Sequence, residues 1–407
     1  MRVKGYSKIT GPGSREPRMQ AADAVSRAEI LGLLGQVGAL SRSEIARSLG
    51  LGPATVTAQV RRLMADGHVR ERPADGPAGQ GATAPGRPRV PVELVADSAA
   101  VMGLSVEPAA VSIVTMSIDG RIRNARTVGF DAAADPVGQL AALVAGQRAA
   151  LEHPDKVAAI GVSVSGAVDR ALSTVRISAT LGWADFALGA ELRDAVGLPV
   201  FVANDLFALS TREVSFGLGR NREDFLLLGL GAGVGMGIIS RRKVFSGAAG
   251  RSTEFGHMSV DPEGPLCLCG NRGCLQVYAG LGQIIDAAPG LGGMDGTIED
   301  LHAALATGNP ELARFMDDVG HRLGRSVGGI VNLLGIATVI VTGRTTSLWP
   351  ALGGGFARGL KETVLTFLHP VDVLVKDWTE YEGAVGAAGL ALHTAVSLNV
   401  PLRPVHA

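Results

Sequence analysis

Residues 254–276, EFGHMSVDPEGPLCLCGNRGCLQ, hold all three cysteines of this 407-residue chain together with one histidine. The four candidate metal ligands follow the pattern His-x9-Cys-x-Cys-x4-Cys and are His257, Cys267, Cys269 and Cys274. Three thiolates and one imidazole form the closed tetrahedral set that structural zinc prefers. Buried reduced cysteines beside an unrelated histidine are the alternative. Because no coordination position is left for water, we expect structural Zn²⁺ and no zinc-dependent hydrolysis.

The cysteine usage also bears on the cellular compartment. An odd number of cysteines packed into one short segment argues against a disulfide framework and for metal or redox chemistry. No apolar run reaches membrane-spanning length, and the first residues, MRVKGYSKITGPGSREP, lack the hydrophobic core of a signal peptide. We therefore expect a cytoplasmic protein without a membrane partner.

Outward from the cysteine segment, apolar strands alternate with helical stretches from Val90 onward. Strands are predicted at 111–120, 157–164, 200–202 and 225–230, and helices at 136–151, 188–196, 205–216 and 311–334. This alternation is typical of an α/β architecture, and its length of about 300 residues indicates two lobes.

The N-terminal part has a helical pattern from Ala21 to about Arg70. Ser41 and Glu44 form a capping box that opens a second helix, Gly50-Leu51-Gly52 interrupts the chain, and a third helix covers residues 54–65. This is the helix-turn-helix order. The third helix directs apolar residues to one face and leaves a polar face suited to the DNA major groove, with Thr55, Thr57, Ala58, Arg61 and Arg62 as the predicted DNA contacts. A three-helix bundle with a polar outer face would show the same pattern.

The segment after the third helix favours DNA binding. Residues 67–71 are predicted to form a strand, and residues 74–88, rich in Pro, Gly and Ala, form a wing tip or linker. Arg87 and Arg89 in the sequence GRPR suit contacts to the DNA backbone or minor groove, although a solvated linker would also carry them.

The charge distribution is uneven. Residues 1–90 contain 14 Lys and Arg against 7 Asp and Glu, which gives them a net charge of +7. The remaining 317 residues contain 24 Lys and Arg against 31 Asp and Glu, which gives them a net charge of −7. A basic head on an acidic body suits a nucleic-acid-binding module attached to a second unit.

Several segments resemble the ROK group of sugar kinases, open reading frames and repressors. They are IGVSVSGAVD (160–169), VAND (202–205), GAGVGMG (231–237), EFGH (254–257) and the Cys-x-Cys-Gly-x-x-Gly-Cys run, and together they extend the resemblance over roughly residues 90–395. The resemblance implies a two-lobed actin-like, ribonuclease-H-like ATPase-type domain. The N-terminal helix-turn-helix is similar to that of the repressor branch.

The resemblance also implies a sugar site. Asn204, Glu254 and His257 match sugar-hydroxyl contacts, and Asp205 matches the base that takes a proton from the sugar in the kinases. Carboxylates and amides are suited to bind vicinal hydroxyls. Gln276 stands where the family has a glutamate, and Thr180 where it has an asparagine. Without the resemblance, Asn204-Asp205 would be interpreted as a helix cap.

The nucleotide signatures depart from the family pattern. The first phosphate loop, Asp-x-Gly-Gly-Thr in the family, is Ser105-Val106-Glu107-Pro108-Ala109 in this chain. The usual threonine of the second loop is Ala232, and the adenosine-side Gly-Gly is Gly343-Arg344. A carboxylate and a proline at a phosphate site oppose ATP binding, so we expect no kinase activity and only a vestigial base in Asp205.

The sequence thus predicts a transcriptional regulator, most simply a repressor of carbohydrate uptake or metabolism genes. Four parts are expected: a disordered basic arm at 1–20, a winged helix-turn-helix domain with its linker at 21–89, a first lobe at 90–203 completed by a helix at about 380–397, and a second lobe with the zinc loop at 204–379. Its expected partners are operator DNA, a sugar effector and a second copy of the chain, as a homodimer or tetramer. The alternatives are an ATP-dependent sugar kinase with a vestigial head and a regulator that responds to a protein.

Overall fold

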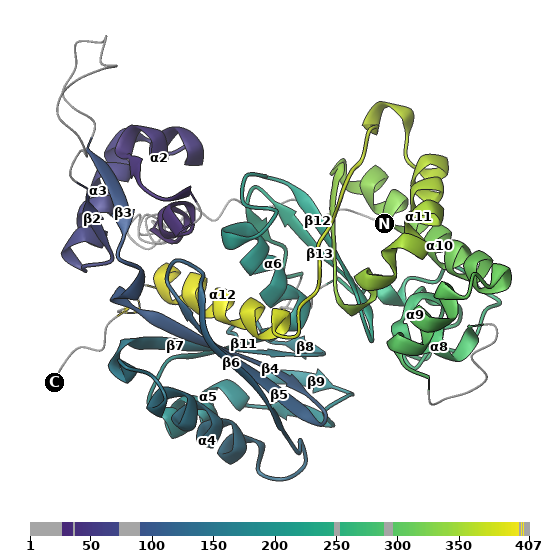
Figure 1. Ribbon diagram of the computed structural model, residues 1–407, viewed down its shortest axis with the longest axis horizontal. Coiled ribbons are helices and arrows are strands. Elements are labelled where there is room, and N and C mark those ends of the chain that lie inside the picture. The colour runs from purple at the N-terminus through teal and green to yellow at the C-terminus, as the bar shows by residue number, and fades with distance from the viewer. Residues whose placement is uncertain are drawn as a thin grey trace, which may run out of the picture.

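The computed structural model describes residues 27–35, 37–72, 90–247, 253–288, 296–398, 400 and 402. It comprises a small N-terminal head and a body of two lobes, each lobe built on a five-stranded sheet (Figure 1). The predicted class, a winged helix-turn-helix joined to a two-lobed α/β domain, is confirmed. The predicted arm at 1–20 and the linker at 74–88 lie outside the described residues.

The head consists of three helices and a three-stranded antiparallel sheet. A first helix at residues 27–35 precedes α2 (Arg42–Leu49) and α3 (Pro53–Ala65), and the sheet has the order β1-β3-β2, formed by β1 (Leu40–Ser41), β2 (Val69–Glu71) and β3 (Pro91–Leu94). The predicted capping box is present, because the Ser41 side chain accepts from the Glu44 N–H and the Glu44 carboxylate accepts from the Ser41 N–H. Gly50 ends α2 in the left-handed conformation, with φ of 63°. The turn between α2 and α3 is thereby set by local sequence.

The first lobe has the strand order β11-β7-β4-β5-β6 and a small side sheet, β10-β9-β8. Its elements are η1 (Ala96–Ser98), β4 (Ala100–Glu107), β5 (Ala110–Ser117), β6 (Ile122–Gly129), α4 (Pro136–Ala149), η2 (Pro154–Lys156), β7 (Val157–Val164), β8 (Ala167–Val168), β9 (Val175–Ser178), β10 (Trp183–Phe186), α5 (Leu188–Val196), β11 (Val200–Asn204) and, from the far end of the chain, α12 (Glu382–Ser397). Helices α4 and α5 pack on one face of the large sheet, and α12 crosses the other (Figure 1).

Two glycines allow α12 to lie directly on the sheet. A Cβ atom added at Gly103 would lie 2.0 Å from the Ala384 carbonyl oxygen, and one at Gly161 would lie 1.9 Å from that of Ala387. Larger residues on β4 and β7 would push the helix away, so this packing depends on both glycines.

The second lobe has the strand order β14-β13-β12-β15-β16. Its elements are α6 (Asp205–Phe216), β12 (Phe225–Leu230), β13 (Val234–Ser240), β14 (Lys243–Val244), η4 (Phe255–His257), α7 (Gln276–Ala279), α8 (Leu281–Ala287), α9 (Ile298–Ala306), α10 (Pro310–Leu334), β15 (Thr338–Thr342), η5 (Arg344–Leu348), α11 (Trp349–Thr363), η6 (Thr366–Leu368) and β16 (Asp372–Val375). The α10–α11 pair and the apolar face of the sheet enclose a separate core that contains Met316, Leu352 and Phe356.

The two lobes meet at a buried charge network beside α6. The Glu213 carboxylate accepts from Lys376 at 2.9 Å and from Arg212 at 2.6 Å, and Lys376 also donates to Glu382 at 2.6 Å. Burial would by itself raise the pKa of Glu213, but the charges of Lys376 and Arg212 outweigh it and lower the pKa. Because Lys376 follows β16 and Glu382 opens α12, the network ties α6 to the strand that returns the chain to the first lobe.

The head and the first lobe share one hydrophobic core. Leu31, Val60 and Val92 of the head belong to the same buried cluster as Met116 of β5 and Leu392 of α12. A hydrogen bond of 3.0 Å between His68 Nδ1 and Ser98 Oγ, both buried, adds a polar contact at this junction. The head is therefore packed on the body as part of one folded unit.

None of the described helices is long and apolar enough to cross a membrane.

Candidate DNA interface, metal cluster and effector site

Helix α3 presents a polar face to solvent. Thr57, Ala58, Arg61 and Arg62 are exposed and Thr55 is half-buried, whereas Val56, Gln59, Val60 and Leu63 are buried in the head. The exposed side chains lie on one side of the helix because their spacing of three and four residues matches its turn. Five of the seven predicted DNA contacts therefore share one face, and the other two, Arg87 and Arg89, lie outside the described residues.

The N-terminal end of this face carries small side chains. Gly52 is the N-cap, Pro53 opens the helix, and Thr57 and Ala58 follow on the exposed face. The Thr57 hydroxyl donates to the Pro53 carbonyl at 2.8 Å. A methyl group and Ala58 beside it favour apolar contact with a thymine methyl, while Arg61 offers a bidentate donor one turn later.

The base of the wing is held by two ion pairs. Arg42 at the start of α2 donates to Glu71 of β2 at 2.9 Å, and Arg70 donates to Glu93 of β3 at 2.7 Å. The Arg70 side chain keeps 69% of its surface exposed. Arg70 is a candidate phosphate contact that was not predicted from the sequence. Its position in the strand that follows the third helix could have indicated it.

The four predicted metal ligands converge. One ligand atom from each of His257, Cys267, Cys269 and Cys274 lies within 4.8 Å of all the others. Cys267 Sγ is 3.5 Å from His257 Nδ1, and Cys269 Sγ is 3.6 Å from Cys274 Sγ. The four ligand atoms are therefore grouped closely, and three thiols with one imidazole are the donor set of a tetrahedral metal site.

The loop around this cluster is shaped by its glycines. Gly273 has φ of 59°, and a Cβ atom there would lie 1.6 Å from the Asp261 carbonyl oxygen. The tight approach lets Ser259 pair with Cys274 and Leu266 with Arg272 in two short antiparallel bridges. Residues 259–274 therefore form a compact hairpin that brings the thiols back to His257.

The predicted sugar-site residues come from two segments that both pack against β13. Asn204 and Asp205 lie at the start of α6, and Glu254 and His257 lie at the two ends of η4, and α6 and η4 each contact β13. The Asn204 side chain accepts from the N–H of Leu206 at 2.9 Å and donates to the Gly166 carbonyl at 3.0 Å. Asn204 is thus the N-cap of α6, and its amide is oriented by α6 and by Gly166 of the first lobe.

Asp205 opens α6. Desolvation raises the pKa of its carboxyl, the N–H of Leu206 opposes this, and the charge of Glu107 adds to the rise. A cavity of about 160 Å³ opens next to Asn204. Its lining combines apolar with polar and charged side chains: Val168, Leu172, Ala203, Phe207, Asp169, Arg170 and Ser246. A hollow of this size is large enough for part of a small ligand.

Gln276 faces the second glycine-rich loop. Its Oε1 accepts from the Val234 N–H at 2.8 Å, and its Nε2 donates to the Ala232 carbonyl at 3.0 Å. Both ends of the amide are occupied by backbone, which fixes the loop at the start of β13. The side chain therefore holds the backbone of residues 232–234 in place.

The former phosphate loop contains an ion pair that sequence alone did not suggest. Glu107 ends β4, Pro108 and Ala109 turn directly into β5, and the Glu107 carboxylate accepts from Arg344 Nη2 at 3.0 Å. Both side chains are half-exposed. The two departures from the kinase pattern, in opposite lobes, are partners of each other.

Comparisons with known proteins agree with both parts of the chain. The ROK family model matches residues 119–394, and a winged helix-turn-helix DNA-binding model matches residues 27–70. The xylose repressor of Bacillus subtilis is 28% identical over 251 residues, which cover 59% of this chain and 62% of that protein. The match thus leaves more than a third of that relative uncovered.

Two solved structures have the same fold. The structure of a ROK family transcriptional regulator, a homologue of the Escherichia coli MLC protein, superposes with a TM-score of 0.76 at 22% identity and covers 94% of this chain and 99% of that one. A ROK family glucokinase from Streptomyces griseus, solved with glucose and AMPPNP, gives a TM-score of 0.62 at 28% identity and covers 72% of this chain and 99% of the kinase. The superposition on the regulator includes the head of this chain, whereas the superposition on the kinase leaves about a quarter of this chain unmatched.

Proposed function

The chain belongs to the ROK family, and on that premise we propose that it is a DNA-binding transcriptional repressor whose operator affinity is controlled by a sugar or sugar derivative. The observation that carries the proposal is the exposed polar face of α3, with Arg61 at its centre, on a head that shares a hydrophobic core with the sensor body. A helix of this kind reads base edges in the major groove. The name of the xylose repressor supports the same class of function.

Two copies of the chain would bind one operator. A helix-turn-helix protein reads a pseudo-palindromic site when its two recognition helices lie about one DNA turn apart, roughly 34–36 Å. We propose a homodimer or tetramer acting on DNA in the cytoplasm, with the basic head facing the duplex. An effector that favours another spacing of the heads would release the operator.

The effector site lies where α6 and η4 meet β13. Asn204, Asp205, Glu254 and His257 supply the amide, carboxylate and imidazole groups that bind vicinal hydroxyls, and Gln276 holds the loop beside them.

The cysteine cluster would hold Zn²⁺ through His257, Cys267, Cys269 and Cys274. The fit rests on the donor set and on the convergence of the four ligand atoms, and a bound ion would supply structural stability without hydrolytic chemistry. Because His257 belongs to both sets, the hairpin that carries the thiols also orients one effector contact.

Loss of kinase activity is part of the proposal. The first phosphate loop carries Glu107 and Pro108, and Arg344 is engaged by Glu107 where the kinases accommodate adenosine. A carboxylate repels a triphosphate, and proline offers no N–H to bind it. The retained Asp205, with its raised pKa, is the specific observation that favours the alternative of an active sugar kinase.

One experiment separates these functions. Full-length protein is tested for binding to duplexes selected from a random DNA library, with D-xylose, D-glucose and N-acetyl-D-glucosamine added in turn, and for ATP-dependent phosphorylation of the same sugars. We expect selective DNA binding that a sugar weakens, and no phosphoryl transfer. Phosphorylation that disappears in Asp205→Asn would establish the kinase, and DNA binding that no sugar alters would indicate control by another signal.

A further inference from the structure

The hairpin of β13 and β14 reaches from the effector site to the DNA-binding head. Val234 at the start of β13 donates its N–H to Gln276, and the strand then runs for seven residues, about 20 Å at the rise of a β-strand, to the turn at Arg241 and Arg242. Six consecutive residue pairs with the central strand β12 hold β13 next to the short edge strand β14. The contact between Val234 and Gln276 and the turn therefore lie at the two ends of one continuous strand.

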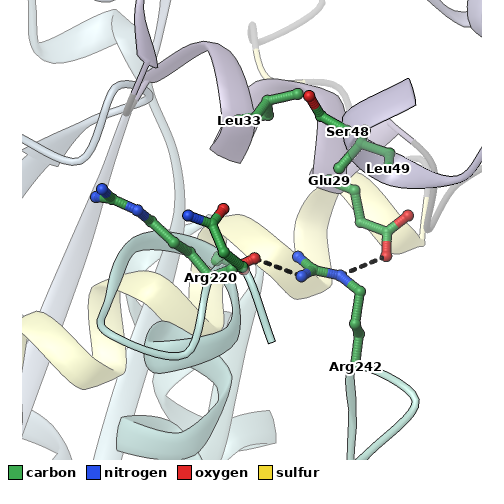
Figure 2. Close-up of a pocket in the computed structure, with 8 residues that line it drawn as sticks. Glu29, Leu33, Ser48, Leu49, Arg220 and Arg242 are labelled. Atoms are coloured by element: carbon green, nitrogen blue, oxygen red, sulfur yellow. Dashed lines mark hydrogen bonds and ion pairs between the residues drawn. The ribbon is translucent and has the colours of Figure 1, made fainter. Parts of the chain in front are cut away.

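Arg242 at this turn binds the head. Its Nε donates to Glu29 Oε1 at 3.3 Å, and Glu29 belongs to the first helix of the head. The same guanidinium donates to the Val214 carbonyl near the end of α6, at 3.2 Å. It also donates to the Arg220 carbonyl (Figure 2). One side chain thus joins the second lobe, the helix between the lobes and the head.

The contact is enclosed. The side chains of Glu29 and Arg242 retain only 17% and 20% of their surface, and desolvation raises the pKa of Glu29. A hollow of about 20 Å³ beside the pair is lined by residues of the first helix, the end of α2 and the body (Figure 2). A partly buried ion pair of this kind costs more to break than an exposed one.

The turn itself is unusual for its sequence. A two-residue hairpin turn of type I′ has two positive φ angles, which Asn-Gly supplies without strain, yet this turn has Arg241 and Arg242 at φ of 51° and 60°. Left-handed conformations cost roughly 1–2 kcal/mol for such residues. The side chain of Arg242, with its three contacts, accounts for the presence of arginine at that position.

We propose that Arg242 is the positioning residue that transmits effector binding to the DNA-binding head, through its ion pair with Glu29. The inference rests on the proposed function and specifies how its two sites communicate. Effector binding at the start of β13 shifts the turn, and the shift changes the placement of the first helix, against which α2 and α3 pack. Because coupling is reciprocal, operator binding also changes the segment from 231 to 247.

The test compares Arg242→Ala and Glu29→Gln with Arg241→Ala as the matched control. Arg241 lies in the same turn and carries the same charge, but its side chain is exposed and only its N–H is held, by Asp224. Operator affinity is measured by fluorescence anisotropy on a selected duplex, with and without D-xylose, D-glucose or N-acetyl-D-glucosamine. We expect the two variants to bind the operator within about threefold of wild type, but to lose a factor of about 5 or more of the sugar-induced change in Kd, whereas Arg241→Ala responds fully.

A full sugar response in Arg242→Ala overturns the inference. If that variant does not fold, Arg242→Lys and Glu29→Gln decide, since both keep most of the packing. If no sugar in the panel changes operator affinity of the wild type, the proposed control by a sugar fails. The coupling between the two sites is then measured by hydrogen exchange. Operator binding should alter the exchange of residues 231–247 in the wild type and not in Arg242→Ala. An absent change in wild type, or the same change in both proteins, contradicts the inference.

Discussion

Arg344 Nη2 donates to both carboxylate oxygens of Glu107, at 3.0 and 3.3 Å, and so links the second lobe to the first. Each residue alone is a departure from the kinase pattern. Together they form one ion pair, so the two departures are joined in the folded protein.

This ion pair should contribute little to stability and should be sensitive to salt, because both side chains are half-exposed. Glu107→Ala and Arg344→Ala are each expected to lower the free energy of unfolding by less than about 1 kcal/mol, and the double variant no more than either single variant. Denaturant titrations at low and high salt measure this. The pair Arg176–Asp185, exposed within the first lobe, is the matched control. Fully additive losses would show that Glu107 and Arg344 do not interact in solution.

Arg61→Ala should weaken operator binding by roughly 1–3 kcal/mol, about 5- to 150-fold, because its guanidinium lies on the exposed face of α3 and would pair with a base or phosphate. Anisotropy at fixed salt on the selected duplex gives the ratio. Arg314→Ala, an exposed arginine on α10 of the second lobe, controls for the loss of charge and should bind as wild type does. Equal affinity of Arg61→Ala and wild type would remove this residue from the interface.

The protein should contain one zinc ion per chain, and its removal by a chelator should lower Tm by roughly 5 °C or more. A structural zinc site contributes several kcal/mol to the free energy of unfolding, and each kcal/mol corresponds to about 2–4 °C in Tm for a domain of this size. Cys274→Ser, at a buried ligand, should lose the metal. Leu268→Ser, a fully exposed position in the same hairpin, should retain it. Elemental analysis and calorimetry report both quantities. A Tm that does not depend on the metal would contradict a structural role.

His393 on α12 should make the protein acid-sensitive. Burial lowers its pKa from the ordinary 6.5 to about 4, and the nearby charge of Arg242 acts in the same direction. The unfolded chain takes up the proton at about 6.5, so the stability from the neutral folded imidazole is present above that pH and is lost, at about 1.4 kcal/mol per pH unit, as the pH falls toward 4.

His393→Leu tests this dependence by removing the titrating group. Between pH 7.5 and 5.5, wild type should lose about 1.4 kcal/mol more unfolding free energy than the variant, because one pH unit of this interval lies below 6.5. Between pH 8.5 and 7.5 the two proteins should change in parallel. Equal losses in the acid interval would mean that the pKa of the His393 imidazole is not lowered in the folded protein.

The sequence predicted those features whose causes are local. The bounds of β7, α5, α6 and β12 agree with the prediction because apolar runs, caps and glycines define them within a few residues. The capping box of Ser41 and Glu44 is likewise a matter of three-residue spacing. The four predicted metal ligands lie within residues 257–274, so spacing was sufficient to group them.

The features that escaped prediction join distant segments. Glu107 and Arg344 are 237 positions apart, and Glu29 and Arg242 are 213 apart, and neither partner is distinctive without the other. The orientation of Gln276 toward Ala232 and Val234 also depends on how two loops meet. Such contacts follow from the packing of the lobes and the head, which no single segment encodes.

We propose that α3 binds DNA and that the two-lobed body, without kinase activity, controls this binding in response to a sugar. The most direct measurement is the anisotropy of a selected operator duplex titrated with full-length protein between about 50 and 200 mM salt, with and without each sugar of the panel. We predict selective binding that weakens with salt and weakens further with one sugar. Indifference to every duplex, accompanied by ATP-dependent phosphorylation of a sugar, would contradict this account.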